Sequence, residues 1–267
     1  MADVTAGGVR FHVQRLGVRR TADARSTQPV VFVHGLGMDN LSSFYYTLAN
    51  PLANAGAEVV LYDLRGHGLS ERPRTGYKLG GSVADLAALL DALGIEGPVH
   101  LVGNSYGGTV ALGFAVAHPE RVASMVLIEA HLTIAGWAEQ MKATLCRIGS
   151  DLATGNTFVW LKQYRRKFAL MAERADDLIN GTTFLTDLLT VDLVNPSSLQ
   201  TLGCPVRAVY GEQSDAVRYA RYLDEHLPSC TLTVLPGCGH SVLMDATAAL
   251  REIVLDWFAT QATAGVR

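Results

Sequence analysis

The feature that most constrains this 267-residue chain is a serine held between glycines at the junction of two contrasting segments. An apolar run over residues 99–102 precedes it, and the small, helix-compatible residues 109–115 follow it. The stretch itself reads Gly103-Asn104-Ser105-Tyr106-Gly107-Gly108. A strand-to-helix turn this tight has no room for a side chain at either flanking glycine, and it projects the serine hydroxyl outward. The pattern predicts a strand–turn–helix with Ser105 as a nucleophile.

The composition favours a soluble globular protein. Hydrophobic residues make up 49% of the chain and charged residues 18%, and the net charge of -3 gives no electrostatic reason to expect nucleic acid or an anionic membrane as a partner. No apolar stretch approaches the roughly 20 residues that cross a bilayer. Residues 1–8 lack the basic and apolar regions of a signal peptide. We expect a cytoplasmic protein, and the sequence predicts no particular oligomeric state.

The cysteines indicate neither disulfides nor a metal site. Cys146, Cys204, Cys230 and Cys238 lie far apart, without a C-x-x-C pair. Cys238 and His240 are two residues apart, but no second pair at zinc-site spacing exists elsewhere. Free, mostly buried thiols are expected, with no metal and no cofactor.

Apolar runs alternate with helical segments along most of the chain, which is the pattern of parallel strands buried on both faces. An alternating segment at residues 9–14 fits a strand with one exposed face. The other expected strands span 30–33, 58–62, 99–102, 124–128, 206–210 and 231–235. The expected helices span 43–55, 82–93, 106–118, 217–226 and 246–260. This order predicts a doubly wound α/β core.

One interval, between residues 129 and 204, breaks the alternation. It contains no clear strand, but its helical stretches carry the large aromatic residues Trp137, Phe158, Trp160, Tyr164, Phe168 and Phe184. A helical insertion at this point would cover the serine. We therefore expect residues 133–195 to form a cap, or lid, inserted into a core made of 1–132 and 196–267. The alternative is that these helices extend the core.

A serine hydroxyl becomes nucleophilic only with a base within hydrogen-bond reach. His240 is the best candidate among the eight histidines, because it lies in a glycine-rich loop after the last expected strand. That base needs a carboxylate to orient it. Asp215 follows the strand at 206–210 and is the expected acid, while Glu129, at the end of the strand at 124–128, is the alternative acid.

A tetrahedral intermediate also needs donors for its oxyanion. The backbone N–H of Tyr106, at the amino end of a helix, is one expected donor. The loop 34–39 supplies the other, with Leu36 as its expected source, and His34 is expected to hold this loop in place. Gly35, Trp137 and Trp160 are the expected lining of the substrate pocket.

These motifs, taken in order, resemble the α/β-hydrolase superfamily over nearly the whole chain except the cap. The segments that carry the resemblance are His34-Gly35-x-Gly37, Asp63-Leu64-Arg65-Gly66-His67-Gly68-Leu69-Ser70, Gly103-Asn104-Ser105-Tyr106-Gly107-Gly108, Gly211-x-x-x-Asp215 and Gly239-His240. The resemblance implies a mostly parallel eight-stranded sheet flanked by helices, with a helical lid insertion and a Ser-Asp-His triad. It also implies that the loop 63–70 is mainly structural.

The expected function is that of a serine hydrolase acting on a carboxylic ester or thioester of a small to medium hydrophobic acyl group. Asn104 and the paired glycines also resemble the carbon–carbon bond hydrolases of aromatic ring degradation. Those enzymes usually carry a tryptophan after the catalytic histidine, where this chain has Ser241. An acyltransferase or lyase on the same triad is another alternative, and a non-catalytic ligand receptor is an alternative of a different class.

The expected partner is a small-molecule substrate, and one form of it is an acyl thioester bound to a carrier protein. Four basic residues of the cap, Lys162, Arg165, Arg166 and Lys167, suggest such a carrier. At helical spacing they lie largely opposite the apolar residues, so a solvated helix face explains them equally well.

Overall fold

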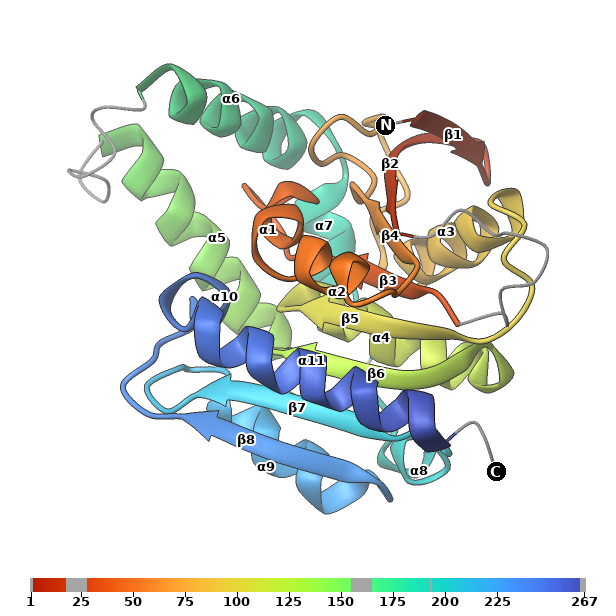
Figure 1. Cartoon of the computed structure of the whole chain (residues 1–267). Coiled ribbons are helices and arrows are strands. Elements are labelled where there is room, and N and C mark those ends of the chain that lie inside the picture. Colours follow the sequence, from red (N-terminus) through yellow and green to blue (C-terminus); the bar gives the residue numbers. More distant parts are fainter. Residues whose placement is uncertain (1, 18–27, 155–164, 193, 265–267) are drawn as a thin grey trace.

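The computed structural model describes residues 2–17, 28–154, 165–192 and 194–264, and it contains one eight-stranded sheet (Figure 1). The strand order is β1-β2-β4-β3-β5-β6-β7-β8. The pairs β1–β2 and β2–β4 are antiparallel, and the remaining neighbours are parallel. The prediction of a mostly parallel eight-stranded sheet is confirmed.

Each strand expected from the sequence is present, and one further strand was missed. The bounds are β1 Ala2–Ala6, β2 Val9–Leu16, β3 Val30–Val33, β4 Val59–Tyr62, β5 Val99–Asn104, β6 Val122–Ile128, β7 Val206–Gly211 and β8 Cys230–Leu235. The missed strand, β1, is the edge strand, and its residues are mostly exposed, so it carries little apolar pattern.

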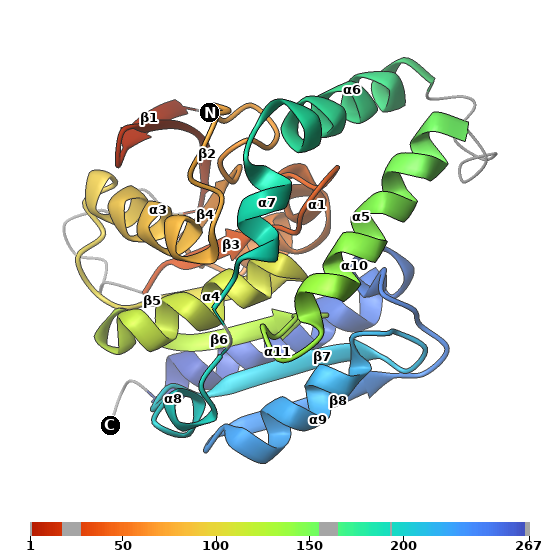
Figure 2. The ribbon, with the colours of Figure 1, turned by 180° about the vertical axis from the view of Figure 1, so that it is seen from behind.

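Helices cover both faces of the sheet. One face carries α1 (Ser42–Phe44), α2 (Asn50–Asn54) and α11 (Thr247–Ala264), which stand in front of the sheet in Figure 1. The other face carries α3 (Leu79–Ala92), α4 (Tyr106–Ala117) and α9 (Val217–His226). Figure 2 turns the molecule by 180°, so that these helices stand in front of the sheet. The short helices α8 (Pro196–Gln200) and α10 (Val242–Asp245) complete the core. None of the described helices combines the length and apolar character that a membrane span requires.

The expected helix at residues 43–55 is divided by a π-helical turn, Tyr45–Ala49, between α1 and α2. Pro51 explains the irregularity, since it has no N–H to donate to the carbonyl of Thr47 four residues earlier. The Nε of Arg251, in α11, donates to that carbonyl instead at 3.2 Å. The Asn50 side chain likewise donates to the carbonyl of Tyr45 at 2.6 Å. Side-chain donors thus reach two carbonyls of the irregular turn.

Two apolar clusters lie on the two faces of the sheet, because successive strand residues point to opposite sides. On β3, Val31 and Val33 belong to the cluster beneath α3, α4 and α9, whereas Val30 and Phe32 belong to the cluster beneath α2 and α11. Burial on both faces explains why these strands read as continuous apolar runs.

The described residues between β6 and α8, within the interval expected to form the cap, contain three helices: α5 (Trp137–Thr154), α6 (Arg165–Gly181) and α7 (Phe184–Leu189). Figures 1 and 2 show α5 and α6 projecting beyond the carboxyl end of the sheet. A cover over Ser105 formed by these helices remains a prediction. Trp160 and the basic Lys162 lie outside the described residues, as do Phe158 and Tyr164.

The base of this region is bonded to the loop that precedes α3. The N–H of Tyr77 donates to the Asp187 carboxylate at 2.9 Å, and the N–H of Thr183 donates to the carbonyl of Arg74 at 2.9 Å. The ring of Phe184 packs edge-on against Tyr77 with centroids 5.7 Å apart. These contacts fix α7 to the core.

A buried ion pair connects the expected structural loop 63–70 to α3. The Nε of Arg65 donates to Asp85 Oδ2 at 2.6 Å, and a second guanidinium nitrogen donates to Oδ1 at 2.5 Å. Only 13% of the Arg65 side chain and 5% of the Asp85 side chain are exposed. The carboxylate beside Arg65 raises the pKa of the guanidinium. This two-point pairing supports the structural role that the resemblance implies.

Asp85→Ala is therefore expected to lower the free energy of unfolding by about 3–5 kcal/mol, since it leaves a buried guanidinium without its partner. The matched control is Asp91→Ala, which removes the carboxylate of a pair with Arg121 whose acidic side chain is 65% exposed. That change is expected to cost less than about 1 kcal/mol. Urea unfolding followed by circular dichroism measures both, and equal losses would contradict the structural role of the buried pair.

Candidate functional site

Ser105 occupies the sharp turn between β5 and α4, as the sequence predicts. Its backbone is strained, with φ 53° and ψ -118°. A Cβ at Gly103 would stand 2.5 Å from the carbonyl oxygen of Gly107, and one at Gly107 would stand 1.9 Å from that of Val33. The close backbone packing around the turn therefore requires glycine at both positions.

The imidazole of His240 lies against the Ser105 hydroxyl. Its Nε2 is 3.1 Å from Ser105 Oγ, and its Nδ1 is 2.9 Å from Glu129 Oε2. The His240 side chain is 40% exposed, whereas Glu129 is fully buried. With the proton on Nδ1 donated to the carboxylate, Nε2 is free to accept from the serine hydroxyl. The structure thus aligns a hydroxyl, an imidazole and a carboxylate.

The Glu129 carboxylate is held by three donors. Gly211 N–H donates to Oε1 at 2.5 Å, and the Ser214 hydroxyl and His240 Nδ1–H donate to Oε2. Glu129 follows β6 directly and has a positive φ of 52°. A fully buried carboxylate is tolerated only when hydrogen bonds replace its hydration, and these donors do so.

The structure contradicts the expectation that Asp215 contacts His240. Asp215 is exposed, and its Oδ2 accepts from Gln140 Nε2 at 3.1 Å. Its neighbour Ser214 turns inward instead, with its hydroxyl 3.5 Å from His240 Nδ1. The conformation of the loop after β7 thus directs the serine toward the imidazole and the aspartate toward α5. The alternative acid, Glu129, forms the contact with His240.

Two backbone amides lie where the sequence places oxyanion donors. Tyr106 is the first residue of α4, so its N–H has no acceptor within the helix. The N–H of Leu36 lies in the loop after β3, and no acceptor for either amide is found in the described part of the chain. Their role as oxyanion donors stays a prediction.

Two buried histidines hold the loop that carries Leu36. The N–H of Leu64 donates to His34 Nε2 at 2.9 Å, so the proton of His34 lies on Nδ1, 2.7 Å from the carbonyl of Gly35. The N–H of Gly37 donates to His67 Nε2 at 3.1 Å. Burial lowers the pKa of His67 to about 3, which keeps this ring neutral. The structural role expected for His34 is confirmed.

His131 is a neighbour of His240 that the sequence analysis missed. Its ring lies edge-on to His240 with centroids 5.1 Å apart, and it also packs against Tyr219 at 5.4 Å. The residue is 4% exposed, and neither ring nitrogen has a hydrogen-bond partner among the described residues. Burial, followed by the neighbouring His240, lowers the pKa of His131 to about 3. No motif marks this position, because the contact depends on the tertiary fold.

Of the three residues expected to line the substrate pocket, the structure places Gly35 beside Ser105 and Trp137 in the apolar core. A Cβ at Gly35 would stand 3.4 Å from the Cβ of Ser105, so this glycine borders the nucleophile. Trp137 is 1% exposed and belongs to the core cluster. Its role in the pocket remains a prediction, as does that of Trp160, which lies outside the described residues.

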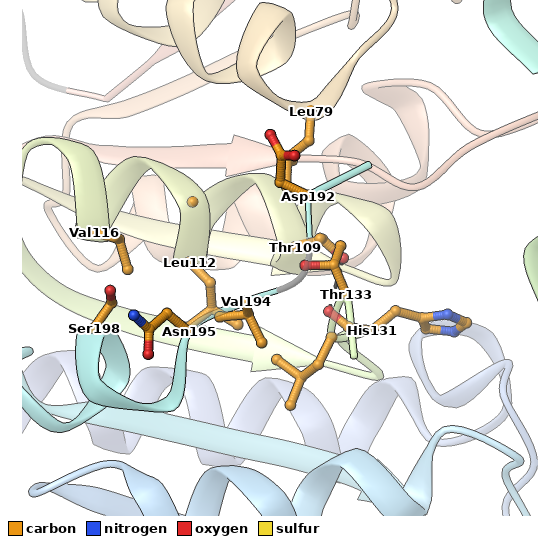
Figure 3. A pocket seen from close by; sticks show the side chains of 12 residues that line it. Leu79, Thr109, Leu112, Val116, His131, Thr133, Asp192, Val194, Asn195 and Ser198 are labelled. Atoms are coloured by element: carbon orange, nitrogen blue, oxygen red, sulfur yellow. Dashed lines mark hydrogen bonds between the residues drawn. The ribbon is translucent and has the colours of Figure 1, made fainter. Parts of the chain in front are cut away.

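A separate cavity of about 250 Å³ lies between α3, α4 and the segment 192–198 (Figure 3). Its lining includes Leu112, Asn195 and His131, but not the three aligned residues Ser105, Glu129 and His240. Figure 3 shows the imidazole of His131 directed away from the other labelled side chains of this cavity. The cavity is therefore distinct from the candidate catalytic residues.

Comparison with known proteins places the chain in a family. The model of the alpha/beta hydrolase family matches residues 30–253, so the chain belongs to that family. A 2-hydroxy-6-oxononadienedioate/2-hydroxy-6-oxononatrienedioate hydrolase of Paraburkholderia phymatum is 26% identical over 96% of this chain and 93% of that protein. A non-heme chloroperoxidase of Streptomyces lividans is 40% identical over 111 residues, which cover 40% of this chain and 38% of the length of that relative.

Solved structures show the same fold at low sequence identity. An esterase from Exiguobacterium antarcticum has a TM-score of 0.76 and 22% identity, covering 96% of this chain and 98% of its own. A meta-cleavage product hydrolase from Pseudomonas fluorescens IP01 has a TM-score of 0.69 and 22% identity, covering 97% and 98%. The chain is thus an α/β hydrolase whose relatives and structural neighbours differ in reaction.

The buried His131 predicts a pH-dependent stability. Its pKa is lowered in the folded protein, so it stays neutral while the unfolded chain takes up a proton below the ordinary histidine pKa of 6.5. Stability is therefore lost as pH falls from about 6.5 toward about 3. His131→Phe removes this titration. Between about pH 7.5 and about pH 5, the variant is therefore expected to lose about 2 kcal/mol less unfolding free energy than the wild type.

Urea unfolding of the wild type and the variant at both pH values measures this difference. Any packing cost of phenylalanine cancels, because it is present at both pH values. An identical pH dependence in the two proteins would show that His131 is not held neutral.

Proposed function

We propose that this protein is a serine hydrolase that cleaves a carboxylic ester or thioester of a small to medium hydrophobic acyl group through an acyl-enzyme. The observation that carries the proposal is the series of contacts from the Ser105 hydroxyl through His240 to the buried Glu129 carboxylate. This is the geometry by which an imidazole activates a serine and a carboxylate fixes the tautomer of the imidazole.

In the proposed first half-reaction, Ser105 Oγ attacks the acyl carbon while its proton passes to His240 Nε2. The carbonyl oxygen becomes an oxyanion, which the N–H groups of Leu36 and Tyr106 stabilise. Each such donor contributes roughly 3–4 kcal/mol to the transition state. The positive end of the α4 dipole adds to this effect at Tyr106. Collapse of the intermediate expels the alcohol or thiol, which takes the proton from His240.

In the second half-reaction, water attacks the acyl-serine and gives its proton to His240 Nε2. A second oxyanion forms at the same two amides, and its collapse releases the carboxylic acid and returns the proton to Ser105. Glu129 stays ionised and stabilises the imidazolium in both half-reactions. A water molecule and the acyl compound are the only reactants, so the proposal needs no cofactor.

Carbon–carbon bond hydrolysis is the second candidate function. It is favoured by the similarity to the Paraburkholderia phymatum hydrolase over 96% of this chain. Ser241 stands where the resemblance leads one to expect tryptophan, which is why ester cleavage is placed first. A further relative is the 2-hydroxy-6-oxo-2,4-heptadienoate hydrolase of Pseudomonas putida, and the compound in its name provides a probe for this alternative.

Labelling with a fluorophosphonate and turnover of p-nitrophenyl esters and acyl thioesters test the leading proposal. Wild-type protein is expected to be labelled and to release p-nitrophenol, and Ser105→Ala is expected to lose both activities because the attacking oxygen is absent. Cleavage of the dienoate without ester or thioester turnover would favour the carbon–carbon candidate. Absence of labelling and of all turnover would favour the non-catalytic ligand receptor.

The acid is identified by a matched pair of isosteric variants. Glu129→Gln is expected to lower kcat for the preferred ester by roughly 10³–10⁴-fold, because an amide cannot stabilise the imidazolium. Asp215→Asn alters an exposed hydrogen bond to Gln140 and is expected to change kcat less than about ten-fold. A large loss in Asp215→Asn with a small loss in Glu129→Gln would reverse the assignment.

A further inference from the structure

Asp39 lies in the loop after β3, five residues beyond His34, and the proposed reaction does not use it. We propose that its carboxylate determines substrate charge: it disfavours substrates that carry an anionic group close to the scissile carbonyl and admits neutral or cationic ones. This inference deepens the proposed function and rests on it, since it concerns the acyl substrate attacked by Ser105.

The contacts of Asp39 direct its carboxylate toward the nucleophile. Oδ2 accepts from Gly35 N–H at 2.7 Å and from the Asn104 side chain at 3.4 Å, while Oδ1 accepts from Asn40 N–H at 2.9 Å. Asn104 directly precedes Ser105. The carboxylate is therefore held by both segments that the proposed mechanism uses. These are the loop 34–39, which contains the expected donor Leu36 and is called the oxyanion loop below, and the turn at Ser105.

The space beside Gly35 shows how near the charge is to the reacting atoms. A Cβ built at Gly35 would stand 3.1 Å from Asp39 Oδ2 and 3.4 Å from Ser105 Cβ. The Asp39 carboxylate and the Cβ of Ser105 thus border the same side of this glycine, one residue before the expected donor Leu36. Asp39 is also partly exposed, which leaves its charge accessible to a ligand.

No cation neutralises this charge among the described side chains. Asp39 forms none of the ion pairs found there, and its hydrogen-bond donors are two backbone amides and a side-chain amide. His67 is neutral because burial lowers its pKa to about 3. The other carboxylate near the nucleophile, Glu129, is already paired with His240. The oxyanion loop therefore carries a net negative charge.

The negative charge of Asp39 acts on any charged group of a substrate bound beside Ser105. Two like charges at the edge of a protein repel each other with an energy that falls with distance and with the local dielectric. Dissolved salt screens the exposed part of this interaction. For an anionic group three or four bonds from the scissile carbonyl, we expect roughly a ten-fold penalty in kcat/KM relative to a neutral group of the same length.

The test uses three p-nitrophenyl esters of matched length: the neutral pentanoate, the anionic monoester of glutarate and a cationic trimethylammonio-butanoate. Wild-type kcat/KM is expected to be about ten-fold lower for the anionic ester than for the neutral one, and highest for the cationic ester. The anionic-to-neutral ratio is expected to approach unity in about 0.5 M NaCl, where the Debye length is only a few ångströms.

Asp39→Asn removes the charge while retaining an oxygen that can accept from Gly35 N–H. It is expected to raise the anionic-to-neutral ratio of kcat/KM by roughly five- to ten-fold. Glu96→Gln is the matched control, since it removes one exposed carboxylate before the amino end of β5, opposite the end that carries Ser105. The control is expected to change the ratio less than about two-fold.

An unchanged ratio in an active Asp39→Asn variant would overturn the inference. If that variant does not fold, the test is the dependence of wild-type kcat/KM on NaCl concentration. An anionic-to-neutral ratio of kcat/KM that is independent of NaCl would overturn the inference. These results differ from failure of the proposed function, in which none of the three esters is cleaved and no Ser105-dependent labelling occurs. That result would overturn both the proposed function and the inference about Asp39.

Discussion

The Glu129 carboxylate is the interaction on which the arrangement of the site depends. It lies at the end of β6 and accepts hydrogen bonds from Gly211 at the end of β7, from Ser214 in the following loop and from His240 beyond β8. Three segments that leave the same edge of the sheet are therefore joined at one buried group. Because a buried carboxylate is costly without donors, the loops must close around it for the fold to be stable. The packing of these loops and the alignment of the imidazole thus depend on the same carboxylate.

The fold was largely predictable from local patterns. The strands β3 to β7 are continuous apolar runs, because helices cover both faces of the sheet, and α9 begins and ends where its pattern predicts. The turn at Ser105 was predictable for a different reason: backbone packing at Gly103 and Gly107 leaves no room for a side chain. Where a local steric requirement fixes the residue type, the sequence identifies the structure.

The choice of acid was not predictable, because it depends on where side chains point after the strands end. Both candidate carboxylates follow neighbouring strands, and the position of Asp215 after the strand at 206–210 made it the expected acid. The turn after β7 presents Ser214 to the imidazole instead, and no pattern of residue types records that rotation. The position of His131 beside His240 was not predicted either, because its neighbours His240 and Tyr219 are distant in sequence. The edge strand β1 was missed because exposed residues carry no periodic signal.

Two adjacent residues connect the aligned Glu129 and His240 to the first helix that follows β6 in the described part of the chain. Ser214 bonds the Glu129 carboxylate, and the next residue, Asp215, bonds Gln140 of α5. Gln140 also accepts from the hydroxyl of Tyr219 at 2.7 Å. The Gln140 contact at the foot of α5 is therefore one residue away from a donor to the Glu129 carboxylate. The foot of α5 and the anchor of the imidazole are thereby joined through two consecutive residues of one loop.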